Sequence, residues 1–437
     1  MFEWYQSLAI LIGGLLFSMA IGLPVALAFF LVNLIGVYLF MGGARGIDQM
    51  ITNATTAVST YSLAPVPLFM MMGTLFFFSG LARRVLDAVD KLIGGLPARL
   101  SYLTLTSGTL FAALSGSSLA NTGMLGSLMV PEMTARGYKK HMCAGPILGS
   151  GGLAVIIPPS GLAVLLGSLA QINIGALLIA GLIPGLVLAL LYVGLIFVQT
   201  RLDPEAAPSY PVEPCPLSER VWLLLRDVAP NVLIVVAVVG SIISGFATPT
   251  ESGAMGVLAV LVLGVAYRAL DWRTIARSLS ETARVMGMIF LLIVASSTFA
   301  QLLAFSGASS GLVNGVTSLK LGSYQMLLVI VLMILLLGMF MDPVSIMLIT
   351  LPIFLPIAAS YDFDLVWFAL IMLIMLEVSF TTPPFGLLLF VMLAVSPHGT
   401  TLSDVSKAAL PYILCCFLLV FMLVLMPGLA TWLPAQL

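Results

Sequence analysis

The sequence predicts an all-α polytopic membrane protein built from two related halves, each with a re-entrant hairpin and a helix broken by proline. Three observations support this prediction. Of the 437 residues, 61% are hydrophobic and only 8% are charged, whereas about a quarter of the residues of a soluble domain carry charge. The charges fall between long apolar runs, which leave room for about ten crossings at roughly 20 residues each. Proline motifs also recur at a fixed offset along the chain.

The same numbers exclude several function classes. Apolar runs of helical length, rather than short alternating segments, indicate helices in an inner-type bilayer and not an outer-membrane barrel. A net charge of −1 provides no basic patch for nucleic acid. The sequence has two histidines and no GxxxxGK[ST], HExxH or CxxC motif, so we expect no nucleotide, haem or zinc cofactor. Because no convergent catalytic set stands out, we do not expect an enzyme.

The Lys and Arg residues predict the topology, because short cytoplasmic loops collect them. We expect an outside N-terminus, the linker Arg201–Asp227 in the cytoplasm, and a bacterial or archaeal inner membrane. In this arrangement 15 of the 17 basic residues lie inside, and only Arg45 and Lys320 lie outside. The predicted crossings are 7–23, 25–41, 62–81, 142–170, 176–200, 229–247, 252–267, 285–304, 366–396 and 408–428.

Two apolar stretches must return to the side from which they entered. These are the first hairpin, at about 102–131, and the second hairpin, at about 324–360, which enters from the opposite face. Basic stretches at 82–99 and 270–284 are predicted to be amphipathic helices on the inner leaflet. Hairpins that enter from opposite faces indicate an inverted repeat, with halves at 1–200 and 228–437 joined by the Pro-rich linker 201–227.

Prolines support the repeat. The motif PPSG at 158–161 recurs as PPFG at 383–386, and the same sequence offset relates Pro24 to Pro249 and Pro131 to Pro356. Prolines that merely punctuate loops do not predict a common offset.

Each double proline interrupts a long apolar span, at 142–170 and at 366–396. Proline lacks an N–H and clashes with the carbonyl one turn earlier, so the helix must open there. Open backbone inside a membrane persists where it lines a cavity or is packed in protein. Freed carbonyls suit Na⁺, and the helix N-termini beyond the break suit an anion. The alternative is a proline kink packed against its neighbours.

The hairpin tips add polar groups. The first tip gathers the hydroxyl and amide oxygens of SGSSLANT at 115–122, and the second contains GMFMDP at 338–343. Such oxygens favour a hard cation, although small residues also pack helices. Asp342 has either a functional role or a helix-capping role, and Glu377 is either a proton or cation partner or an internal structural acid.

Several motifs occur in a fixed order along the chain and resemble those of a known family. SGSSLANTG and GGLAVIIPPS in the first half, then ATPTESG, GMFMDPVSIMLITLPIFLPI and TTPPFGLLLF in the second, resemble the large membrane subunit of tripartite ATP-independent periplasmic (TRAP) transporters. The resemblance runs from about residue 5 to the C-terminus. It implies an elevator-type secondary transporter, related in fold to divalent anion/Na⁺ symporters. It also implies import of an anionic, usually carboxylate, substrate driven by two or more Na⁺. A periplasmic binding protein would deliver this small anion, and a separate small four-helix membrane subunit would complete the complex within membrane lipid.

The resemblance also implies site residues. One Na⁺ site would use Ser115, Ser117 and Asn121 with carbonyls near Ala154, Ile157 and Pro159. A second would use Gly338, Met341, Ser379 and Thr382, and substrate would lie near Ser118, Ser160, Thr381 and Pro383. Members of the family usually have glycine at the positions of Ala154 and Ser379, which carbonyl ligation tolerates. A stand-alone Na⁺/carboxylate symporter and a channel are the rival interpretations.

Overall fold

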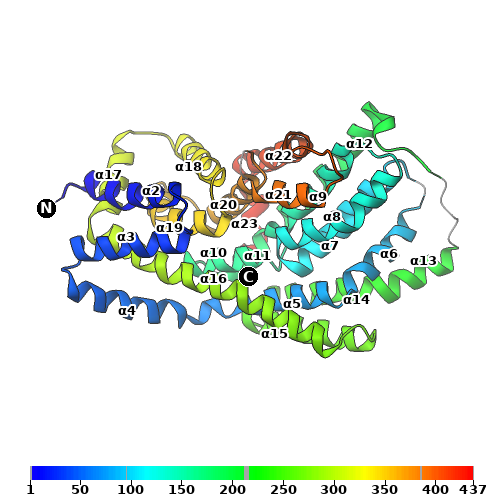
Figure 1. Ribbon diagram of the computed structural model, residues 1–437, viewed down its shortest axis with the longest axis horizontal. Coiled ribbons are helices and arrows are strands. Elements are labelled where there is room, and N and C mark those ends of the chain that lie inside the picture. The colour runs from blue at the N-terminus through cyan, green and yellow to red at the C-terminus, as the bar shows by residue number, and fades with distance from the viewer. Residues whose placement is uncertain (1, 95, 211–215, 384–385, 437) are drawn as a thin grey trace.

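We describe a computed structural model of the chain, comprising residues 2–94, 96–210, 216–383 and 386–436 (Figure 1). Within these residues the ordered elements are all helices. Eight helical segments are long and apolar enough to cross a membrane, judged by length and composition. They are Tyr61–Phe78, Lys140–Leu169, Ile174–Leu202, Leu217–Ile243, Pro249–Ala266, Trp272–Phe305, Pro343–Ser360 and Leu402–Leu425. The all-α polytopic class predicted from the sequence is confirmed.

The first half of the chain runs to the end of α12. Its helices are α1 Trp4–Leu8, α2 Gly14–Ala20, α3 Val25–Phe40, α4 Ala44–Val58, α5 Pro65–Phe78, α6 Leu81–Ile93, α7 Arg99–Ser115, α8 Ser118–Ala135, α9 Lys140–Ile156, α10 Gly161–Leu169, α11 Ile174–Ala180 and α12 Leu182–Leu202, with a π-helical turn at Ala9–Gly13 and a 3₁₀ turn at Tyr61–Leu63.

The described part of the chain after α12 is also helical. The elements are a 3₁₀ turn at Pro204–Ala206, α13 Leu217–Leu223, a π-helical turn at Leu224–Val228, α14 Ala229–Ile243, α15 Pro249–Ala266, α16 Trp272–Phe305, α17 Ala308–Ser318, α18 Ser323–Gly338, α19 Pro343–Ser360, α20 Leu365–Phe380, α21 Leu387–Val395, α22 Leu402–Leu425, α23 Gly428–Thr431 and a 3₁₀ turn at Pro434–Gln436.

Helix boundaries follow the same sequence offset as the prolines. This offset, which relates Pro131 to Pro356, also relates both the first and the last residues of α8 and α19. It relates the first residues of α9 and α20 as well. Each of these pairs therefore occupies the equivalent place in its half of the chain. The opposite insertion of the two halves into the bilayer stays a prediction.

Helices α9 and α20 form the centre of the molecule. The side chains of α9 from Met142 to Ile156 are all buried, as are those of α20 from Trp367 to Phe380. The two helices also contact each other. Each helix leads directly into a proline break. Residues 157–160 of the first break are buried, whereas Pro383 of the second is exposed.

Two helical regions differ from the sequence prediction. Helix α4 lies in a stretch for which no crossing was predicted, because the sequence there is too polar for a span. The helix nevertheless buries Gly46 and Asn53 and packs against α16. Helix α16 joins the predicted interfacial stretch 270–284 and the crossing 285–304 into one 34-residue helix. Asp271 caps its start, accepting from the Thr274 N–H at 2.7 Å, and no proline interrupts the helix.

Residues 203–210, which follow α12, contact the turn between α8 and α9. The guanidinium of Arg136 lies 3.8 Å from the centre of the Tyr210 ring. Lys139 forms an ion pair with Asp203 at 2.6 Å, and its backbone N–H donates to the Ala206 carbonyl at 2.9 Å. Part of the linker predicted at 201–227 from its prolines is therefore packed against the protein.

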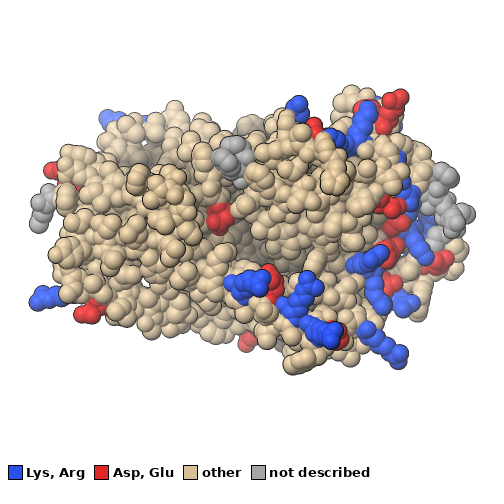
Figure 2. Space-filling model, viewed as in Figure 1, with Lys and Arg blue, Asp and Glu red and all other residues tan. Residues whose placement is uncertain are grey.

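Charged side chains gather at one end of the molecule. Figure 2 shows Lys and Arg concentrated around α6, α12 and α13 and also low in the middle of the visible face, near α15, while the left-hand part of the view carries few charged side chains. This uneven distribution agrees with basic loops lying on one side of a membrane. Which side is cytoplasmic stays a prediction.

Candidate functional site

The first break, residues 157–160, follows directly from two prolines at the end of α9. In a continuous helix, residues 158 and 159 would donate to the carbonyls of Ala154 and Val155. Both are prolines without an N–H, so these carbonyls lose their helical donors. Helix α10 then restarts at Gly161, where the Ser160 hydroxyl caps it by accepting from Ala163 N–H at 3.3 Å.

The tip of the first hairpin rests on this break. The chain reverses between α7 and α8 at Gly116, which has a φ of 57° in the left-handed region. A methyl group built on Gly116 would lie 3.1 Å from the Pro159 carbonyl oxygen and 3.1 Å from the Gly161 nitrogen. The fold thus brings Gly116, which lies between the predicted residues Ser115 and Ser117, beside the predicted residue Pro159.

Asn121 fixes α8 to the neighbouring helices and keeps one oxygen free. Its side-chain amide donates to the carbonyls of Gly108 at 3.1 Å and Ser150 at 3.0 Å. The side chain is 1% exposed, and its Oδ1 has no hydrogen-bond partner among the described residues. A buried acceptor without a donor is costly, so this oxygen is suited to a cation.

The described residues of the second break are joined by hydrogen bonds to the end of α20 and to each other. The N–H of Thr382 donates to the Ser379 carbonyl at 3.2 Å, and the Thr382 hydroxyl donates to the Val378 carbonyl at 2.7 Å. Gly386 N–H donates to the Thr382 carbonyl at 3.1 Å. Pro383 is described and exposed, whereas Pro384, the other proline of the predicted pair, lies outside the described residues.

The second hairpin tip meets α20 without room for a side chain. A methyl group built on Gly338 would lie 2.0 Å from Ser379 Cβ and 3.0 Å from its Cα. Met341 is buried at the same tip. Asp342 caps α19, because its carboxylate accepts from the N–H groups of Val344 at 3.0 Å and Ser345 at 3.1 Å. The capping role proposed for Asp342 is the one that the structure supports.

Glu377 joins the two halves of the site. Its carboxylate is 4% exposed and accepts from the Ser118 hydroxyl at 2.8 Å, so α20 holds the start of α8. The other oxygen, Oε1, has no hydrogen-bond partner among the described residues. A methyl group on Gly152 would lie 3.4 Å from Glu377 Cγ, so glycine leaves room for this side chain. Of the two roles weighed for Glu377, the internal hydrogen-bonded one has direct geometric support.

Most of the residues expected near substrate are buried, and their hydroxyl groups are engaged in hydrogen bonds within the protein. The Ser118 and Ser160 hydroxyls bond as described above, and the Thr381 hydroxyl donates to the Val378 carbonyl at 2.9 Å. All three residues are buried, and Pro383 is the exposed member of the predicted set. Sequence reasoning did not find the Ser118–Glu377 contact, because its partners are 259 residues apart.

Comparison with known proteins identifies the family of this chain. Residues 12–429 match the family model for the tripartite ATP-independent periplasmic transporter, DctM component. The chain belongs to this family. It is 33% identical over 377 residues to the C4-dicarboxylate TRAP transporter large permease protein DctM of Pseudomonas aeruginosa, covering 86% of this chain and 85% of the relative. The resemblance inferred from the motifs is therefore confirmed.

One further sequence relative and one solved structure are also similar to this chain. It is 28% identical to the isethionate TRAP transporter permease protein DctMQ of Oleidesulfovibrio alaskensis, over 94% of this chain and 64% of that one. Its fold is similar to the crystal structure of the Alcanivorax borkumensis YdaH transporter, with a TM-score of 0.62 at 13% identity over 94% of this chain and 97% of that one. These relatives are transporters and not enzymes, and the predicted transporter fold class is confirmed.

Proposed function

We propose that this chain is the large permease subunit of a TRAP transporter that uses Na⁺ to import a small organic anion, with a carboxylate as the favoured substrate class. The observation that carries the proposal is the contact of each hairpin tip with the proline-broken segment of its own half, Gly116 with Pro159 and Gly338 with Ser379 near the end of α20. Each contact gathers carbonyl and hydroxyl oxygens that hard cations prefer.

The first cation position is supported by acceptors that lack donors. The carbonyl of Ala154 has no helical N–H, and Asn121 Oδ1 has no partner among the described residues. Bound Na⁺ would be held by these oxygens together with those of Ser115, Ser117 and the break carbonyls. At the second position Ser379, Thr382, Gly338 and Met341 would serve.

The anion is supported by helix polarity. Helices α8 and α10 begin side by side, at Ser118 and Gly161, and their first N–H groups form a region of positive potential. The substrates named for the two relatives, a C4-dicarboxylate and isethionate, are both anions. Since the hydroxyls of Ser118 and Ser160 are engaged, we propose that the substrate is bound chiefly through backbone N–H groups.

The cycle we propose is an elevator movement. The Ser118–Glu377 bond makes the first hairpin and α20 one body, and both cation positions lie in or against that body. Na⁺ would order the two tips and complete the anion site before this body slides. A membrane potential assists, because moving one net charge inward is worth about 2.3 kcal/mol per 100 mV.

The tripartite family description supports two partners, a separate small membrane subunit and a periplasmic binding protein. The test is to reconstitute the chain with both and follow uptake of a C4-dicarboxylate with and without an inward Na⁺ gradient. We expect uptake to need Na⁺ and all three proteins. Transport by this chain alone would instead favour the stand-alone symporter, and a current without binding protein would favour the channel.

Matched variants test the ion sites. Asn121→Ala should raise the Na⁺ concentration for half-maximal uptake, whereas Asn231→Ala should not. Asn231 is equally buried, also donates to a backbone carbonyl and also has a free Oδ1, but lies in α14. Thr382→Val should weaken Na⁺ dependence and Thr382→Ser should preserve it, because serine keeps the oxygen. Unchanged Na⁺ activation in Asn121→Ala and Thr382→Val would refute the assignment.

A further inference from the structure

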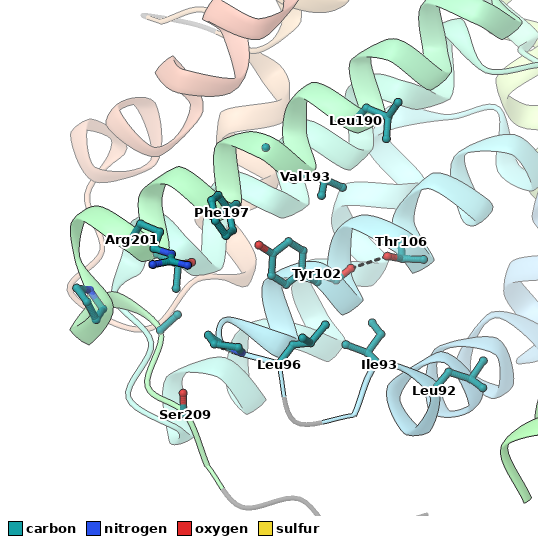
Figure 3. Close-up of a pocket in the computed structure, with 15 residues that line it drawn as sticks. Leu92, Ile93, Leu96, Tyr102, Thr106, Leu190, Val193, Phe197, Arg201 and Ser209 are labelled. Carbon is teal, nitrogen blue, oxygen red and sulfur yellow. Dashed lines mark hydrogen bonds between the residues drawn. The ribbon is translucent and has the colours of Figure 1, made fainter. Parts of the chain in front are cut away.

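A groove of about 1300 Å³ lies away from the hairpin tips, between the α6–α7 connection and α12 (Figure 3). Its volume exceeds the roughly 300–1000 Å³ of pockets for small ligands. Leu92, Leu96 and Pro97 form one wall, Tyr102 and Thr106 of α7 form the floor, and α12 forms the other wall. The α12 wall consists of Leu190, Val193, Gly194, Phe197, Thr200 and Arg201.

The groove is apolar along its length and basic at one end. Leu190, Val193 and Phe197 are exposed apolar side chains of α12. Arg201 lies at the end of the helix, its guanidinium 5.1 Å from the centre of the Phe197 ring. Among the described residues no carboxylate lies within ion-pair distance of Arg201. Within the described part of the chain, this cation beside an apolar groove therefore has no anionic partner.

The dimensions match one leaflet of a bilayer. Leu190 and Arg201 are eleven residues apart on α12, which corresponds to about 16 Å along a helix. Half of the hydrocarbon core of a bilayer is about 15 Å thick. Arg201 is in the last turn of α12, two residues before Asp203 of the Lys139 ion pair. It is therefore at the level of lipid headgroups when Leu190 is near the bilayer centre.

We propose that this groove binds one anionic phospholipid, with its phosphate on Arg201 and its acyl chains along α12. Guanidinium groups suit phosphate oxygens because their donors are arranged in a planar fork. Ser209, at the rim beside the basic end, can donate a further hydrogen bond to the headgroup. The lipid would contact both the connection into the first hairpin and α12, two segments that lie far apart in the sequence.

Native mass spectrometry of the purified full chain tests the proposal. Phosphatidylglycerol and phosphatidylcholine with identical acyl chains are titrated separately, and the affinity of the tightest retained lipid is compared. We expect the wild type to prefer phosphatidylglycerol. Arg201→Gln should weaken phosphatidylglycerol binding about fivefold, equivalent to the ~1 kcal/mol of one basic residue at an anionic surface. It should leave phosphatidylcholine binding unchanged.

A groove-filling variant keeps the test independent of charge. A methyl group built on Gly194 has no atom within 4 Å, so Gly194→Phe fills the groove without a clash in the fold. It should abolish the tight site for both lipids. The controls are Gly240→Phe, where a built methyl group also meets no atom within 4 Å, and Arg273→Gln, whose side chain is exposed on α16. Neither control should change lipid binding.

Three results would overturn the proposal. The first is equal affinity of the wild type for the two lipids. The second is unchanged binding in Arg201→Gln and Gly194→Phe, or an equal loss in both controls. The third is release of the Gly194-dependent lipid when the small membrane subunit is added, which would assign the groove to that protein. Because the measurement is lipid binding and not uptake, it does not depend on the proposed transport function.

Discussion

Replacing Gly338 by alanine should separate the second hairpin tip from α20. The alanine methyl group would lie 2.0 Å from Ser379 Cβ and 3.0 Å from Ser379 Cα. Carbon atoms prefer about 3.5–4.0 Å, so the tip must move by at least ~1.5 Å. A Cβ has no rotamer with which to avoid the contact, and α20 is buried on all sides. We expect a loss of about 1–3 kcal/mol, the usual cost of overpacking.

The assay is thermal unfolding of the purified chain, followed by Na⁺-dependent uptake in liposomes. Gly338→Ala should lower the unfolding midpoint and raise the half-maximal Na⁺ concentration, because the displaced tip contributes ligands to the proposed second site. The double variant Gly338→Ala/Ser379→Gly removes the clashing Cβ and should recover most of both losses. Gly287→Ala is the control, since its methyl group meets no atom within 4 Å. Equal behaviour of Gly338→Ala and Gly287→Ala would refute the reasoning.

Three further predictions concern polar contacts. Glu377→Ala leaves the buried Ser118 hydroxyl without its acceptor and should cost about 1–3 kcal/mol of thermal stability, whereas Glu377→Gln keeps an acceptor and should cost less; equal losses would contradict this. Asp342→Ala should cost about 0.5–2 kcal/mol through the lost cap, and Asp342→Asn should be nearly neutral in the same unfolding assay. The pKa of Asp203 lies below its ordinary value of 3.8 because Lys139 donates a hydrogen bond to it. Its stabilising contribution is therefore present above about pH 4 and lost as the pH falls below that value, so between pH 5 and pH 3 the wild type should lose more stability than Asp203→Asn.

Local sequence was sufficient for the fold class and for the first proline break. Two successive prolines remove two helical donors at residues 157–160, whereas single prolines such as Pro131 and Pro146 lie inside continuous helices. The length of the apolar runs, which predicts membrane helices, and the positions of the basic residues, which predict topology, are also local properties of the sequence. The family motifs added the expected site residues, which stay a prediction; in the structure Gly116 lies against Pro159 and Gly338 against Ser379.

Other features could not be read from the chain. Helix α4 was missed because it is too polar for a crossing, and only its packing against α16 explains its burial of Asn53. Residues 203–210 after α12 are packed against the protein because Arg136 and Lys139, which follow α8, contact Tyr210 and Asp203. Both outcomes depend on partners distant in sequence.

The sequence by itself determined that this is a helical membrane transporter with two proline-broken helices, because hydrophobic length and the chemistry of proline are properties of a segment. Only the tertiary structure decided that Glu377 accepts from Ser118, that Gly338 presses on Ser379, and that Arg201 ends an apolar groove. Each of these is a contact between segments far apart in the chain. No local pattern encodes such a contact, because it exists only once the helices have packed.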